Sequence, residues 1–142
     1  MRTKNSKVQL RTAPEKAWAA LTRPDLVAKW QYGAVLTTTW EVGSRIEFRA
    51  EWEGQVFAQW GQVLEYREPV KLRYSLFAPR PDLVDRPENY FEMVYTLEPC
   101  DGGTLVTFTQ NDPRPLIGER EAEVPDEVNP VLLALKGVAE GL

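Results

Sequence analysis

The sequence predicts an α+β fold in which one strand and two short helices precede about six antiparallel strands and a C-terminal helix. Two short segments near the N-terminus, residues 13–21 and 23–30, carry apolar residues at helical spacing. Segments in which apolar and polar residues alternate then dominate the middle of the chain. Such alternation is typical of antiparallel strands with one buried face, so the middle of the chain should form a one-sided sheet.

Both helical segments have a clear start. Pro14 and Pro24 stand at first helical positions, where the missing N–H is no loss, and each is followed by an acid that the positive end of the helix dipole stabilises. Trp18 and Trp30 lie on the apolar sides of these helices. We expect these two indoles, together with Tyr66, to pack the helices against the sheet.

The strands are predicted with different clarity. Residues 45–53 place apolar side chains on one face and charges on the other, and residues 70–76 repeat this pattern. Other strand segments are 7–12, 34–40, 55–67 with a bend near Gly61, and a hairpin formed by 90–98 and 104–110.

Two proline-rich stretches and a last helix complete the chain. Residues 78–89 hold three prolines and should form a long loop over the sheet edge or over a pocket mouth. A second such passage, 112–125, leads to a helix that starts at Pro130 and carries an apolar stripe to the C-terminus.

Composition narrows the function classes. A chain of 142 residues fits one domain, 1–142, and a net charge of −4 disfavours a nucleic-acid partner. The chain has no histidine and one cysteine, which excludes histidine-dependent nucleophiles, histidine metal sites and an intrachain disulfide. We expect no cofactor and no metal. Without an apolar leader or a membrane-length stretch, a cytoplasmic location is expected.

Different short motifs follow one another along almost the whole chain. They are Ala13-Pro14-Glu15 with Ala17-Trp18, the stretch 24–30, Val42-Gly43, the stretch 61–65, the stretch 94–99 with Gly103-Thr104, Leu135-Lys136 and Glu140-Gly141. In this order and spacing the chain resembles the helix-grip, START-like or SRPBCC superfamily, which includes the birch-pollen allergen and polyketide cyclases. Within it, the chain is most similar to the AHSA-type domain family, the homologues of the activator of heat-shock protein ATPase.

The resemblance implies a curved antiparallel sheet of about six or seven strands that grips a long C-terminal helix around an internal cavity. One helix cannot bring all concave side chains of such a sheet into mutual contact, so some should line a void. Each candidate is either pocket wall or ordinary core, and the candidates are Phe48, Trp52, Trp60, Tyr74, Phe91, Met93, Phe108, Val131, Leu135 and Val138. Glu92 and Gln110 are the polar residues among them that either face the cavity or face solvent.

Three functions stay open at this stage. The first is a small binding protein, monomeric or homodimeric, that encloses a hydrophobic or aromatic small molecule between sheet and helix. The second is a cyclase- or hydrolase-like enzyme on an aromatic or polyketide-type ligand, with an acid or a tyrosine as general base. The third, implied only by the family, is a chaperone-associated stress protein. Because the chain has no histidine, the sequence favours binding over catalysis.

Overall fold

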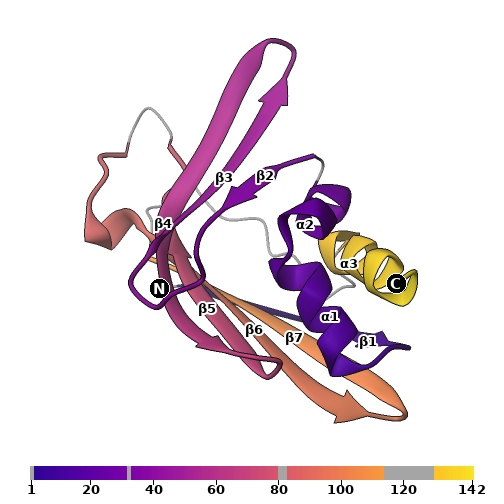
Figure 1. Cartoon of the computed structure of the whole chain (residues 1–142). Helices are drawn as coiled ribbons and strands as arrows, with labels where there is room; N and C mark the ends of the chain where they lie inside the picture. The colour runs from indigo at the N-terminus through magenta and orange to yellow at the C-terminus, as the bar shows by residue number, and fades with distance from the viewer. Residues whose placement is uncertain (1, 32, 80–82, 114–129) are drawn as a thin grey trace.

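The computed structural model describes residues 2–31, 33–79, 83–113 and 130–142, and the side chains of Arg2, Trp52 and Pro130 lie outside that description. The described residues form one seven-stranded antiparallel sheet with three helices on one side (Figure 1). The strands are β1 (Arg2–Leu10), β2 (Val35–Thr37), β3 (Arg45–Trp52), β4 (Gln55–Arg67), β5 (Lys71–Leu76), β6 (Phe91–Cys100) and β7 (Gly103–Asp112). The helices are α1 (Pro14–Thr22), α2 (Pro24–Trp30) and α3 (Pro130–Glu140), with a 3₁₀ turn η1 (Pro87–Asn89). The predicted order and fold class are confirmed.

The strand order across the sheet is β1-β7-β6-β5-β4-β3-β2. Because β1 and β2 lie at opposite edges, the segment that joins them must cross a whole face of the sheet. That segment contains α1 and α2, so the topology itself brings two helices over the concave face (Figure 1). The hairpin of β3 and β4 extends beyond the rest of the sheet (Figure 1).

Strand β1 begins earlier than alternation predicts, at Arg2 instead of residue 7. Its first half is polar on both faces and therefore carries no alternation signal, yet it pairs in register with β7. Side-chain hydrogen bonds across this pair join Thr3 to Asn111 and Thr109 to Asn5. The backbone ladder and these polar contacts define the strand, without the apolar residues that the pattern requires.

Strand β4 contains the predicted irregularity, slightly later than expected. Its pairing with β5 shifts register between Val63 and Glu65, so Leu64 is an extra residue in the strand. The shift keeps Val63 buried and also turns Tyr66 toward the helices, where its hydroxyl accepts a hydrogen bond of 3.2 Å from the indole of Trp18. A regular strand would have pointed one of these two side chains to the other face.

The end of α1 is completed by indoles. The carbonyl of Ala20 would ordinarily accept the N–H four residues later, but residue 24 is proline and has none. The Nε1–H of Trp30 donates to this carbonyl at 2.7 Å instead. In the same way, the Nε1–H of Trp40 donates to the carbonyl of Thr22 at 3.0 Å. The predicted packing role of Trp30 therefore includes capping the preceding helix.

Helix α3 has eleven residues and packs against α1, α2 and β1. Leu132, Leu135 and Ala139 form its fully buried stripe. Lys136 fixes the helix to the sheet edge, because its ammonium donates to the carbonyl of Gln9 at 2.8 Å. Most of the predicted passage 112–125 lies outside the described residues. No helix of the described chain is long and apolar enough to cross a membrane.

Candidate functional site: a cleft on the concave face

A cleft of about 270 Å³ lies on the concave face, between the sheet and the helices. Its floor comes from strands β3 to β7. On each of these strands every second side chain points to the concave face. Trp30 of α2 and Val131 of α3 form the opposite wall. The other lining residues are Gln31, Phe48, Gln59, Tyr74, Leu76, Met93, Tyr95, Phe108 and Gln110.

Aromatic rings form a continuous row along the floor. The ring centroids of Phe48 and Tyr74 are 5.7 Å apart, those of Tyr74 and Tyr95 are 6.3 Å apart, and those of Tyr95 and Phe108 are 4.8 Å apart. The row therefore spans β3, β5, β6 and β7. Such contacts between rings stabilise the floor beyond simple burial of area and hold its shape.

Two phenols lie within this apolar floor. Tyr74 and Tyr95 are 3% and 2% exposed, and burial raises the pKa of both hydroxyls above the ordinary value. Both phenols are therefore neutral at physiological pH and act as hydrogen-bonding groups. The raised pKa also makes either one a poor general base near neutral pH.

Alkaline pH should destabilise the protein through these phenols. An unfolded tyrosine ionises near pH 10, whereas the folded state holds both protons to higher pH. The contribution of the protonated phenols to the free energy of unfolding is complete below about pH 10. It is lost as pH rises toward the raised pKa of the folded state, by up to about 1.4 kcal/mol per pH unit for each phenol. Urea unfolding between about pH 9 and pH 11 measures this slope. The double variant Tyr74→Phe, Tyr95→Phe should flatten it, and an unchanged slope would contradict the assignment.

Several predicted cavity residues line this cleft, namely Phe48, Tyr74, Met93, Phe108 and Val131. Others belong to the neighbouring core: Phe91 and Leu135 are buried there and Val138 packs against it, but none of the three lines the cleft. The side chain of Trp52 lies outside the described part of the structure. Among the described side chains of α3, Val131 is the one that lines the cleft.

The prediction that Trp60 lines the concave cavity is wrong. Trp60 pairs with Glu47 on β3 and forms a bridge with Phe77, which places its indole on the convex face. The strand irregularity falls at Leu64, after Trp60, so it does not turn this side chain inward. The side chain that faces the cleft from this part of β4 is Gln59.

Sequence reasoning missed Trp30, Gln31, Gln59, Leu76 and Tyr95 as lining residues. The signal for Tyr95 and Leu76 was present, because each stands two residues from a predicted lining residue on the same strand. The signal for Gln31 and Gln59 was absent, since exposed and cleft-facing glutamines look alike in a sequence.

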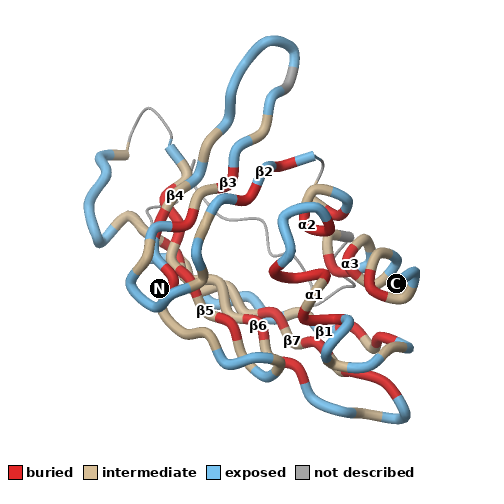
Figure 2. The backbone as a smooth tube through the Cα atoms, in the orientation of Figure 1, coloured by how far each residue is buried: buried red, intermediate tan, exposed pale blue. Residues whose placement is uncertain are grey.

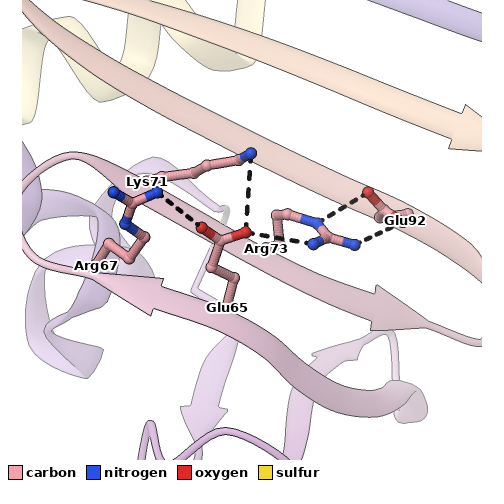
Figure 3. Close-up of polar contacts among 5 residues, drawn as sticks. All are labelled: Glu65, Arg67, Lys71, Arg73 and Glu92. Carbon is pink, nitrogen blue, oxygen red and sulfur yellow. Dashed lines mark hydrogen bonds and ion pairs between the residues drawn. The ribbon is translucent and has the colours of Figure 1, made fainter.

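Of the two polar residues left open, Gln110 lines the cleft and Glu92 does not. Glu92 lies on the convex face, where its carboxylate accepts a hydrogen bond of 3.2 Å from Nε of Arg73 (Figure 3). Arg73 also contacts Glu65 at 3.2 Å, and Arg67 and Lys71 approach the same carboxylate (Figure 3). Although desolvation opposes it, the hydrogen bond from Arg73 and the neighbouring positive charges hold the pKa of Glu65 below its ordinary value.

The convex face has a hollow of its own, open and about 580 Å³ in volume. Asp85, Pro87 and Tyr90 border it. Asp85 accepts hydrogen bonds from the Tyr90 hydroxyl at 2.6 Å and from the Trp60 indole at 3.0 Å. These two hydrogen bonds, with the charge of Arg45, lower the pKa of Asp85. Phe77 is buried beneath both rings. This part of the predicted loop is therefore docked on the sheet, on the side away from the cleft.

The concave cleft contains few kinds of functional group. Its described lining consists of apolar side chains, two neutral phenols and three amides, with no charged residue among them. Within the described chain, no group of three acids or cysteines is placed to hold a metal ion. These residues can enclose an apolar molecule and orient it by a few hydrogen bonds.

The fold and this site together define a helix-grip protein with a cleft between sheet and helices. The family model of the activator of Hsp90 ATPase homolog 1-like proteins matches residues 11–139, and the chain belongs to this family. No curated protein matches the sequence.

Solved structures share this fold. The protein ChR145 from Cytophaga hutchinsonii is 30% identical over 79% of this chain and 77% of its own, with a TM-score of 0.68. MLL2253 from Mesorhizobium loti is 23% identical over 99% and 98% of the two chains, with a TM-score of 0.72. PFC0360w from Plasmodium falciparum, described as an HSP90 activator, is 15% identical over 79% and 74%, with a TM-score of 0.63. At their identities, the latter two show the fold alone.

Proposed function

We propose that this protein binds an apolar, aromatic small molecule in the concave cleft. The observation that carries the proposal is the row of aromatic rings along a cleft whose described lining has no charge. Burial of apolar area against these rings supplies the affinity, at about 25 cal/mol per Å² before the costs of binding are subtracted. The phenols of Tyr74 and Tyr95 and the amide of Gln110 supply orientation.

The cleft suits a molecule of one or two rings. A dry cavity of about 150 Å³ in another protein holds benzene, and this cleft is larger, at about 270 Å³. The enzyme hypothesis finds less support in the same residues. It requires a group that takes or gives a proton near neutral pH, and the titratable groups in the described lining are phenols with raised pKa.

Titration with 2-naphthol tests the proposal. The probe should bind the folded protein saturably, at one site, and should raise the melting temperature as its concentration rises above the dissociation constant. Met93→Trp fills the cleft and should weaken binding at least about tenfold. Val94→Trp is the matched control, because Val94 is the next residue of β6 and faces the other side of the sheet. Equal affinities for the two variants would contradict the proposal.

A second candidate rests on the family match. The family description and the Plasmodium relative both refer to activation of an Hsp90 ATPase. An interaction of this chain with such a chaperone would show as stimulated ATP hydrolysis by a purified Hsp90-type protein. Stimulation that survives Met93→Trp would separate this function from ligand binding in the cleft.

A further inference from the structure

A second hollow, of about 190 Å³, adjoins the concave cleft. Three residues line both spaces, namely Gln31, Phe48 and Gln59, so the two are compartments of one groove. We call the cleft with the tyrosines the inner compartment and the second hollow the outer compartment. The outer compartment is completed by Ala34, Ala50 and Phe57.

The pairing of β3 with β4 gives the direction of the groove. Phe48 lies opposite Gln59, and two residues nearer the hairpin tip Ala50 lies opposite Phe57. Because side chains alternate along a strand, both pairs point to the same concave face. The outer compartment is therefore the continuation of the cleft toward the hairpin that extends from the sheet (Figure 1). Gln31 and Ala34, which follow α2, line it from the other side.

The two compartments differ in chemistry. The inner compartment is lined by five aromatic side chains and includes the buried phenols of Tyr74 and Tyr95. The outer compartment shares Gln31, Phe48 and Gln59 with the inner one, and its remaining lining is apolar, namely Ala34, Ala50 and Phe57. It lies beside the β3–β4 hairpin, most of which is exposed (Figure 2). Phe57 is 54% exposed there, a large apolar side chain in a position where the fold does not bury it.

We propose that the ligand is elongated, with a ring-bearing polar head in the inner compartment and an unbranched apolar chain in the outer compartment. The chain passes between Gln31 and Gln59 and lies on Ala50 and Phe57. This inference rests on the proposed function of the cleft and adds the shape of its ligand. The ring and its hydroxyl match the aromatic floor with its phenols, and the chain covers the exposed face of Phe57.

A series of 4-alkylphenols, from ethyl to octyl, tests the proposal on the whole chain. In the unchanged protein, affinity should rise roughly fourfold for each methylene that enters the outer compartment, and should then level off. Ala50→Phe fills the outer compartment, so the gain with chain length should disappear while the affinity for 4-ethylphenol stays the same. Ala50→Leu, a smaller change, should shorten the chain length at which affinity levels off.

Ala58→Phe is the matched control, because Ala58 pairs with Arg49 on the same two strands and faces the other side. It should keep the full gain with chain length. A gain that persists in Ala50→Phe, or that disappears equally in Ala58→Phe, overturns the elongated ligand and leaves binding in the inner compartment standing. Failure of every alkylphenol, including the shortest, to bind the unchanged protein overturns the proposed function and this inference together.

Discussion

Replacing Trp30 by alanine should lower the free energy of unfolding by about 3–5 kcal/mol. The indole is 2% exposed and packs among α1, α2 and the sheet, so its removal leaves a large cavity. It also leaves the carbonyl of Ala20 without the hydrogen bond that the missing N–H of Pro24 cannot supply. Urea unfolding followed by far-ultraviolet circular dichroism measures the change.

Trp30→Phe separates the two contributions. Phenylalanine keeps most of the apolar contact but cannot donate to Ala20, so this variant should lose about 1–3 kcal/mol. A loss below about 1 kcal/mol for Trp30→Ala would mean that the two helices are held without this side chain.

Gly61→Ala should lower the free energy of unfolding by about 3 kcal/mol or more. A Cβ at this position would lie 1.8 Å from the backbone carbonyl oxygen of Ser75. The obstacle is backbone, not the end of a flexible side chain, so β4 and β5 would have to separate where they pair.

Gly137→Ala is the matched control for this glycine. Gly137 lies inside α3, and a Cβ there would meet nothing within 4 Å. The same substitution should therefore stabilise the protein by about 0.5–1 kcal/mol, because alanine loses less conformational freedom in a helix. Equal effects of the two changes in a thermal unfolding assay would show that the close approach at Gly61 is relaxed in solution.

The sequence predicted best those elements in which local pattern and packing agree. In β5, Leu72, Tyr74 and Leu76 are buried and alternate with half-buried polar residues, as their spacing predicts. The starts of α1 and α2 were equally clear, because proline and the following acid act locally. Burial in these elements depends on neighbours along the chain, which a sequence displays.

The cleft was predicted less well because it depends on contacts between distant segments. Trp60 was assigned to the interior for its aromatic character, yet its partners Phe77 and Asp85 lie between β5 and β6, well after β4 in the chain. Gln59 has no apolar signal and still faces the cleft, because the position of the irregularity in β4 decides its side. Moving a bulge along a strand reverses the facing of the side chains between its old and new positions.

The polar first half of β1 shows the same limitation in another form. Neither face of residues 2–6 is apolar, so alternation could not predict the strand, and its pairing with β7 became apparent only from the structure. Edge strands commonly carry polar and charged residues that discourage pairing with other chains. The residue types that protect such a strand also hide it from a pattern-based prediction.

The most direct test of ligand binding in the concave cleft is a set of intermolecular nuclear Overhauser effects between 2-naphthol and methyl groups of the protein. We predict contacts from the naphthol ring protons to the methyl groups of Met93, Leu76 and Val131, which line the cleft. We expect none to Val94 on the other face of β6 or to Leu133 on the exposed side of α3. Contacts confined to residues outside the cleft, with none to Met93, would contradict this prediction.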